Sequence, residues 1–461
     1  MKKYSITNSF ALGAIATLAL AAVTALASPA LAQDAQVTAA SVQKEMQYVF
    51  NTLLFLIGGF LVMWMAAGFA MLEAGLVRSK NVAMQCTKNI ALFAIAGIAY
   101  WVVGYNLMYD GVDGGFMGSF TPKLIPEPAA DAGSYAAASD WFFQMVFCAT
   151  AASIVSGTLA ERIKLWPFLV FVVVLTGIIY PIQGSWKWGA GWLASGADVS
   201  WIKTVAGAEF QDFAGSTLVH STGGWAALVG ALLLGSRIGK YGPNGQIHPM
   251  PGSSMPLATL GTFILWLGWF GFNGGSQLAM GTLSDASSVS KIFMNTNLAA
   301  CGGVVAAIVL NQLFYGKVDI TMALNGALAG LVSITAEPLT PSPIMAILIG
   351  GVGGVIVVFA VPLLDKMRID DVVGAIPVHL LAGIWGTMAV PLTNSGSTFL
   401  AQAIGVGAVA AFVIVASLVM WLILKFTIGL RPTPEQELEG LDKAEIGLEA
   451  YPEFGTGSQR I

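Results

Sequence analysis

The sequence predicts an all-α polytopic membrane protein with about eleven transmembrane helices. Hydrophobic residues make up 56% of the 461-residue chain and charged residues only 10%, whereas a soluble domain carries about 25% charged residues. The apolar residues are gathered in blocks of roughly 20, a length that lets a helix cross the hydrocarbon core of a bilayer.

The first 32 residues have the three parts of a secretory signal peptide. MKKY supplies positive charge, ALGAIATLALAAVTALA a short apolar run, and SPALA ends in Ala-Leu-Ala before Gln33. We therefore predict cleavage after Ala32, a transmembrane domain over 33–430 and a tail over 431–461. The alternative is that this segment is a first transmembrane helix. Cleavage would place the mature N-terminus outside the cell membrane.

Eleven apolar segments are predicted to span the membrane. They are residues 49–73, 84–108, 138–160, 165–184, 213–235, 256–278, 290–314, 321–336, 343–363, 373–391 and 399–428. An odd number of spans with the N-terminus outside places the C-terminus inside. The positive-inside rule supports this orientation, because Arg and Lys recur in the predicted inner loops and the outer loops hold only scattered lysines.

Two histidines lie inside apolar spans in matching contexts. His220 is in VHSTGG of the fifth span and His379 in VHLLAG of the tenth, and each follows an aspartate by eight residues, Asp212 and Asp371. The two spans run in opposite directions. Each imidazole should therefore lie about 12 Å from its own face of a core about 30 Å thick. We predict that the histidines meet near the midplane of a five-plus-five inverted repeat, which one last helix follows.

Ionisable groups inside a membrane usually mark a transport path, although a lone buried histidine is more often a satisfied core residue. Burial disfavours the charged imidazole, so we expect a neutral pair that shares one hydrogen between ring nitrogens. Such a pair suits a small polar neutral molecule or the relay of a proton. It suits a permanent cation poorly, since the sequence places no carboxylate at the midplane.

Aromatic residues and a serine gather at the predicted outer ends of the spans. Phe143 and Phe147 are four residues apart and share a helix face, as do Phe272 and Ser276, while Trp188 lies in an outer loop. Aromatic faces attract cations and a hydroxyl can accept a hydrogen bond. These residues predict an outer cation site, with an interfacial aromatic belt as the alternative.

Ammonium would reconcile this outer site with the neutral histidines. It can bind as an ion, release a proton and cross the apolar middle as ammonia. Potassium cannot release a proton, so the cost of desolvating its charge would exclude it. The sequence shows no metal-ligand spacing among Cys86, Cys148 and Cys301 and no nucleophile elbow or nucleotide loop. We therefore expect no enzyme activity, cofactor or nucleic-acid partner.

Several long motifs, in order, resemble the ammonium transporters of the Amt group in the Amt/Rh/Mep superfamily, over about residues 49–453. They are MLEAGLVRSKN, the Phe-rich segment ending in AERI, DFAGSTLVH, GWFGFNGGS, NGALAGLVSITA, VGAIPVH and ELEGLDKAEIGLEAY. The resemblance implies a homotrimer in the inner cell membrane, with one ammonium pore per subunit and residues 33–430 as the transporter domain. Whether methylammonium is also carried stays open.

The resemblance also implies roles for the outer residues. Phe147, Trp188 and Ser276 would form the recognition site, with Phe143 beside the vestibule. Phe147 and Phe272 would form a stacked gate below it.

Further roles apply to the pore and to nearby acidic residues. His220 and His379 would be the twin histidines of the pore, and Thr335 matches a position near its inner end. Asp212 is interpreted as a helix N-cap that organises the site, and Asp371 as its structural counterpart. Glu73, near the inner end of the first span, is interpreted as structural.

The acidic tail from residue 431 is predicted to be a cytosolic extension with a short helix over 434–449, and a disordered solvated tail is the alternative. It is similar to the segment that contacts PII-type signal proteins in bacterial relatives. It departs from them in AEIG, where relatives often have a histidine before the glycine. Two functional alternatives remain, an ammonium sensor and an electroneutral ammonia channel.

Overall fold

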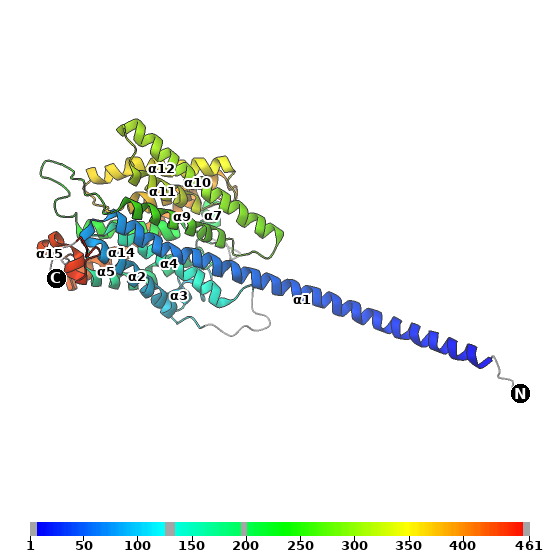
Figure 1. The fold of residues 1–461 in the computed structure, drawn as a ribbon. Helices are drawn as coiled ribbons and strands as arrows, with labels where there is room; N and C mark the ends of the chain where they lie inside the picture. Colours follow the sequence, from blue (N-terminus) through cyan, green and yellow to red (C-terminus); the bar gives the residue numbers. More distant parts are fainter. Residues whose placement is uncertain (1–6, 125–133, 195–200, 455–461) are drawn as a thin grey trace.

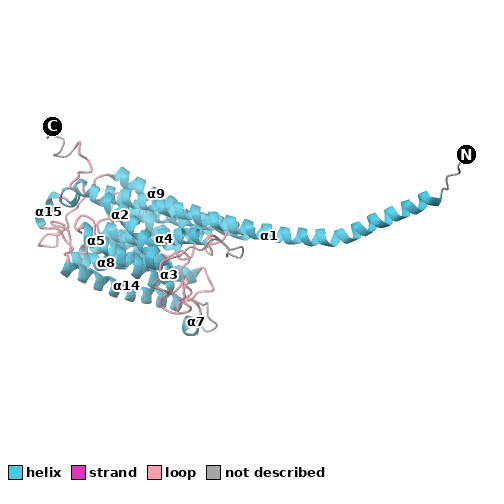
Figure 2. Cartoon of the chain, turned by 90° about the horizontal axis from the view of Figure 1, so that it is seen from below, coloured by secondary structure: helices cyan, strands magenta, loops and turns pink. Residues whose placement is uncertain are grey.

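The computed structural model describes residues 7–124, 134–194 and 201–454, with side chains described from residue 42. The regular elements in these ranges are helices, and they form a bundle from which the first part of α1 (Thr7–Leu76) protrudes (Figures 1 and 2). The predicted signal peptide covers residues 1–6, which lie outside the described residues, and the protruding part of α1. Its cleavage stays a prediction.

The helices after α1 are joined in places by π-helical or 3₁₀ turns. In order they are η1 (Ser79–Asn81), α2 (Val82–Ala99), η2 (Tyr100–Gly104), α3 (Tyr105–Tyr109), α4 (Ala137–Thr158), α5 (Leu165–Val174), η3 (Leu175–Ile179), α6 (Tyr180–Ser185), α7 (Trp201–Ala206), η4 (Ser216–Ser221), α8 (Thr222–Leu234), α9 (Met255–Gly275), α10 (Leu283–Tyr315), α11 (Ile320–Thr335), α12 (Pro343–Lys366), η5 (Ile376–Leu381), α13 (Ala382–Ala389), η6 (Val390–Leu392), α14 (Phe399–Thr427), α15 (Pro434–Glu439) and η7 (Asp442–Ile446).

Nine helical stretches of the described chain are long and apolar enough to cross a membrane. They are Val42–Leu76, Ser79–Tyr109, Ala137–Thr158, Leu165–Ser185, Ser216–Leu234, Met255–Gly275, Leu283–Tyr315, Pro343–Lys366 and Phe399–Thr427. Two shorter apolar stretches, Ile320–Thr335 and Ile376–Leu392, fall where the eighth and tenth spans are expected. The predicted all-α membrane fold with about eleven spans is confirmed.

Helices α1 and α9 pack against each other closely enough to require glycine. A Cβ atom at Gly75 would overlap the backbone of Ala258, and one at Gly261 would overlap the backbone of Leu72. Small residues allow membrane helices to approach backbone to backbone, and van der Waals contact then stabilises the pair. This contact joins the first helix of the predicted first repeat to the first helix of the second.

The surface of the bundle is rich in apolar side chains that no other helix covers. Phe263 on α9, Ile344 on α12 and Phe426 on α14 are 62%, 68% and 81% exposed. An exposed apolar belt of this kind is stable in hydrocarbon and costly in water. It therefore agrees with a bundle embedded in a bilayer.

The C-terminal tail packs against the end of the bundle opposite the free end of α1 (Figure 1). Its carboxylate Asp442 accepts hydrogen bonds from the backbone N–H groups of Ala83 (3.0 Å) and Met84 (2.8 Å), in the first turn of α2. Anionic groups stabilise helix N-termini in this way. The backbone N–H of Leu441 donates to Asn81 (2.9 Å). The solvated-tail alternative is therefore wrong for residues 431–454, which form the two short helices α15 and η7.

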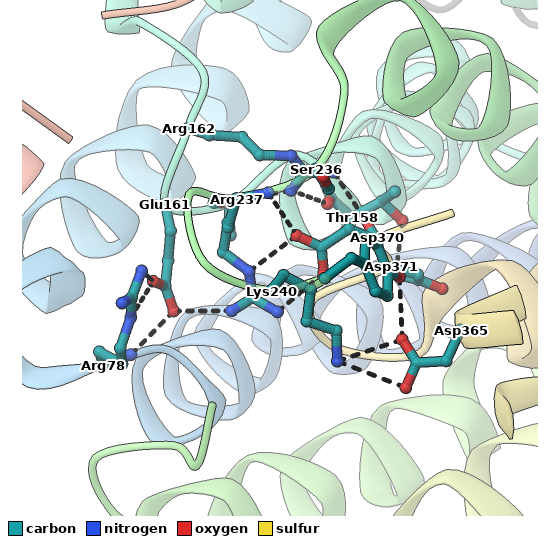
Figure 3. Close-up of polar contacts among 12 residues, drawn as sticks. Arg78, Thr158, Glu161, Arg162, Ser236, Arg237, Lys240, Asp365, Asp370 and Asp371 are labelled. Carbon is teal, nitrogen blue, oxygen red and sulfur yellow. Dashed lines mark hydrogen bonds and ion pairs between the residues drawn. The ribbon is translucent and has the colours of Figure 1, made fainter. Parts of the chain in front are cut away.

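Buried ion pairs connect the loops at this same end (Figure 3). The Arg237 guanidinium bonds Asp370 at 2.8 Å and Glu161 at 3.1 Å, and Arg78 pairs with the same glutamate. Arg162 donates to the backbone carbonyl of Asp370. Burial alone raises the pKa of Asp370, but the hydrogen bonds from Arg237 and the charge of Arg162 outweigh it and lower the pKa to about 2.

Candidate functional site

The two membrane-embedded histidines lie side by side in the centre of the bundle. His220 belongs to η4 and His379 to η5, and both are almost completely buried. Their Nδ1 atoms are 3.1 Å apart and their rings are stacked, with centroids 5.2 Å apart. At this distance one Nδ1 carries a hydrogen and the other accepts it, so the pair shares one proton between the rings.

An aspartate fixes the start of each histidine-bearing helix. The Asp212 carboxylate accepts four backbone hydrogen bonds of 2.8–3.1 Å, from Gly215, Ser216, Thr217 and Leu218. Burial raises the pKa of Asp212 to about 6, although these four N–H groups lower it. Asp371 accepts from the backbone N–H of Ile376 at 2.7 Å and from the Thr158 hydroxyl at 3.0 Å. The two carboxylates therefore position the π-helical turns that carry the histidines.

Four of the residues expected at the outer site line one cavity of ≈ 330 Å³. They are Phe143, Phe147, Trp188 and Ser276. The Trp188 indole N–H donates to the Asp212 carbonyl at 2.9 Å, and the Ser276 hydroxyl donates to the Phe272 carbonyl at 2.8 Å. These bonds orient both side chains, and they leave the serine oxygen free to accept a further hydrogen bond. We call this cavity the vestibule.

Two stacked phenyl rings separate the vestibule from the histidines. Phe147 and Phe272 lie with ring centroids 3.9 Å apart, and both are nearly fully buried. Phe272 in turn lies 5.3 Å from the His220 ring, between centroids. The aromatic pair therefore forms the floor of the vestibule and the apolar side of the histidine pair.

Beyond His379 a narrow space leads to a wide one. His379, Phe69 and Glu73 line a cavity of ≈ 10 Å³, about the room of one water molecule. This cavity shares Asn325 and Val373 with a larger one of ≈ 530 Å³ at the tail end of the bundle. These features follow one another in a row through the protein: the vestibule, the pair of phenylalanine rings, the pair of imidazoles, and the two cavities. We call this row the pore.

Sequence reasoning missed a carboxylate in the vestibule. Asp140 lines the cavity, and its side chain accepts hydrogen bonds from the Tyr105 hydroxyl and from the Gln144 amide (3.2 Å). It lies three residues before Phe143 and seven before Phe147, so a helix-face analysis could have found it. Tyr105 comes from α3, and no local pattern places it there.

Thr335 lies at a different level of the pore from the one expected. Its carbonyl accepts a hydrogen bond from the backbone N–H of Ala214 (3.0 Å), next to the start of η4 and on the vestibule side of the histidines. The resemblance implied a position near the inner end of the pore, whereas α11 ends here, close to the start of η4. The Thr335 hydroxyl accepts from the Trp269 indole N–H at 2.8 Å, and that indole stacks on His220 with centroids 4.9 Å apart. Trp269 is a second residue that sequence reasoning missed.

No group of three or more His, Cys, Asp or Glu side chains within residues 7–124, 134–194 and 201–454 is arranged to hold a metal ion.

Comparisons with known proteins agree on one family. The model of the Ammonium Transporter Family matches residues 53–451. The ammonium transporter Amt2 of Archaeoglobus fulgidus is 43% identical over 419 residues, which cover 87% of each chain. The ammonium transporter Amt1 of Haloferax mediterranei is 38% identical over 418 residues, covering 88% of this chain and 80% of the relative.

Several solved structures have the same fold. A structure named Sensor Amt Protein superposes with a TM-score of 0.79 at 35% identity and covers 87% of this chain and 99% of its own. Mep2 of Candida albicans superposes with a TM-score of 0.72 at 24% identity, covering 84% of this chain and 86% of its own, which shows a shared fold. With a family match that spans nearly the whole helical bundle, this chain belongs to the ammonium transporter family.

Proposed function

We propose that this protein captures ammonium in the vestibule, removes a proton, and passes ammonia through the pore while the proton is relayed separately. The observation that carries the proposal is the 3.1 Å contact between the His220 and His379 imidazoles in the middle of the row of cavities. In this proposal the vestibule faces outward and the tail faces the cytosol, because the basic loops lie at the tail end.

Capture depends on groups that stabilise a small cation. Phe147 and Trp188 offer aromatic faces 6.3 Å apart, edge to face, and Ser276 offers a hydroxyl oxygen. Asp140 adds a negative charge to the same cavity. Together these groups favour ammonium over neutral ammonia at the entrance.

Deprotonation follows from the dry floor of the vestibule. An ion that enters the space between Phe147 and Phe272 loses its hydration, and the two phenyl rings offer no charged group to replace it. Ammonia crosses at a much lower cost. It then meets the imidazole pair, where the Nε2 of His220 has no hydrogen-bond partner among the described residues and can serve the substrate or its proton.

The first test is electrical. Purified protein in liposomes receives an ammonium pulse, with a potassium pulse as the control, and charge movement is recorded together with luminal pH. A saturable ammonium current without a potassium current supports the proposal. A pH change without current would indicate an electroneutral ammonia channel instead, and the absence of both would leave a sensor.

The imidazole pair gives a sharper test of the mechanism. In the double variant His220→Ala, His379→Ala we expect a folded protein whose ammonium current falls or whose exclusion of potassium is lost, since the two paired imidazoles of the apolar midsection are removed. Unchanged current together with unchanged exclusion of potassium would contradict the proposed role.

Ammonium sensing is a second candidate, because one similar structure is named Sensor Amt Protein and because the tail is folded against the bundle. The two functions predict different behaviour in the cell. Variants with abolished flux should abolish growth on low ammonium if the protein is a transporter, and should leave an ammonium-dependent signal intact if it is a sensor.

We also propose the assembly and location that the family resemblance suggests. These are a homotrimer in the inner membrane, a cleaved signal peptide, and a PII-type signal protein as the partner of the tail. The mass of the detergent-solubilised particle, the N-terminal sequence of the mature protein and co-purification with a PII-type protein test the three statements in turn.

A further inference from the structure

A line of buried polar side chains runs from the pore to the docked tail. Glu73 of α1 is 1% exposed and lines the small cavity beside His379. Asn81, Gln85 and Asn89 follow at intervals of four residues at the start of α2, and all three are buried. Side chains spaced in this way lie along one face of a helix. We call Asn81, Gln85 and Asn89 the amide row.

Glu73 and every member of the amide row keep a polar atom without a hydrogen-bond partner among the described residues. These atoms are Glu73 Oε1, Asn81 Nδ2, both polar atoms of the Gln85 amide, and Asn89 Oδ1. A buried polar atom that stays unpaired costs free energy, and native proteins usually satisfy such atoms with ordered water. Four adjacent residues of this kind are suited to hold a chain of water molecules.

The pore end of the line has the features of a proton acceptor. Glu73 Oε2 accepts a hydrogen bond from the Ser156 hydroxyl at 2.8 Å, and the Asn89 side chain lies within hydrogen-bonding reach of the same carboxylate. The buried Lys88 ammonium donates to the Ser156 carbonyl at 2.9 Å. Lys88 therefore supplies a positive charge in the same cluster as the carboxylate.

The other end of the line lies beneath the tail. Asn81 Oδ1 accepts a hydrogen bond from the Leu441 backbone at 2.9 Å, and Asp442 binds the first turn of α2 next to it. A proton that travels along the amide row would therefore leave at the interface between α2 and the tail. That exit is separate from the ≈ 530 Å³ cavity at the end of the pore.

We propose that Glu73 takes the proton that the histidine pair relays, and that water held by the amide row conducts it to the face under the tail, apart from ammonia. The inference rests on the proposed function. The N–H bond of ammonium breaks at the floor of the vestibule as an N–H bond forms at His220 Nε2. The hydrogen on His220 Nδ1 then passes to His379 Nδ1, and the hydrogen on His379 Nε2 passes to Glu73 Oε1 across the small cavity that both residues line. The new O–H bond breaks as the next water accepts the proton. Ammonia leaves through the wide cavity and recombines with a proton beyond it, so each cycle moves one positive charge.

The test separates charge movement from ammonia movement in the same liposomes. In Glu73→Gln, which keeps an acceptor for Ser156 but cannot ionise, the ammonium current should fall by about a hundredfold, the low end of what a positioned proton-transfer group contributes. Ammonia flux should persist, so a luminal alkalinisation that the accompanying proton cancels in wild type should appear in the variant. The thermal unfolding temperature should stay as in wild type. Glu73→Asp should restore part of the current.

A second variant covers the case in which the glutamine variant does not fold. Gln85→Leu has similar volume and removes two unpaired polar atoms, so it should fold at least as well as wild type and still lose current. Glu337→Gln is the matched control. Glu337 is also buried, but its carboxylate lies away from the amide row. It accepts hydrogen bonds from the backbone N–H of Thr340 (3.1 Å) and from the Asn394 amide (2.6 Å).

The outcomes distinguish the two proposals. Wild-type current in both Glu73→Gln and Gln85→Leu overturns the separate proton route and leaves ammonium transport standing. Equal losses of current and ammonia flux also overturn it, since they indicate that Glu73 only ties α1 to α4. An absence of current in the wild-type protein removes the proposed mechanism and this route together.

Discussion

At the scale of single residues, the vestibule differs from a simple aromatic cage because it contains a carboxylate. Asp140 is held by Tyr105 and Gln144 beside Phe143 and Phe147. A charge at this position acts on the ion before it loses its water, so it affects capture more than passage through the aromatic floor.

Replacement of Asp140 by Asn tests this charge with almost no change in shape. We expect the half-saturating ammonium concentration to rise about tenfold, which corresponds to about 1.4 kcal/mol of binding free energy, while the maximal current stays close to wild type. Curves of current against ammonium concentration, recorded at two ionic strengths, measure both the half-saturating concentration and the maximal current. An unchanged half-saturating concentration would show that the aromatic and serine groups alone attract the ion.

Trp188 provides a contrasting variant in the same cavity. Trp188→Leu removes an aromatic face and the hydrogen bond to the Asp212 carbonyl. We expect weaker substrate capture with little loss of stability, because the side chain is only partly buried. A concentration dependence like that of wild type, measured at equal protein content, would count against this role.

At the scale of helical elements, Asp212 and Asp371 determine where the histidine-bearing helices begin. Asp212→Ala would leave four buried backbone N–H groups of η4 without their acceptor. We expect the free energy of unfolding to fall by about 3 kcal/mol and the current to fall with it, because His220 is displaced from His379. Thermal unfolding in detergent and the current assay measure both effects, and a stable, fully active variant would contradict the capping role.

The ion network at the tail end gives a prediction about pH. The pKa of Asp370 is lowered in the folded protein to about 2, from the usual 3.8, so its stabilising effect is complete at neutral pH. It is lost as the pH falls from about 4 through about 2. Asp370→Asn should therefore lower the unfolding temperature at pH 7, because it leaves the buried Arg237 without its main partner. We expect the free energy of unfolding to fall by about 3 kcal/mol.

The comparison with wild type at low pH supplies the control for that experiment. Below about pH 4 the Asp370 carboxyl of the unfolded wild-type chain takes up protons while that of the folded protein stays ionised, so the difference in unfolding temperature between the two proteins should shrink. A difference that stays constant down to the lowest accessible pH would mean that the variant acts through packing rather than charge.

At the scale of the whole molecule, the apolar blocks of the sequence predict the fold because hydrocarbon accepts only long apolar helices. The contact between His220 and His379 was predictable for a similar reason, since each histidine has the same sequence context in a span of opposite direction. Local patterns could not predict interactions between distant segments. One example is the hydrogen bond from Tyr105 to Asp140. Another is the hydrogen bond from the Met84 backbone N–H in α2 to Asp442, which joins residues 358 positions apart in the sequence.

Two further features were out of reach for physical reasons. The π-helical turns η4 and η5 depend on the carboxylates and glycine that precede them, such as Gly215 with φ of 107°, and no hydrophobic period indicates them. The level of Thr335 in the pore was also out of reach, because a motif gives order along the chain and not depth in the membrane.

The stacked rings of Phe147 and Phe272 affect how well a cell can maintain the proton gradient across its membrane. Rings whose centroids lie 3.9 Å apart leave no standing aperture. On the proposed path each passage has to wait for a thermal rotation of the rings, and the membrane stays sealed between passages. Many copies of such a protein can reside in an energised membrane without discharging its proton gradient. Throughput is then increased by making more copies and not by opening the rings wider.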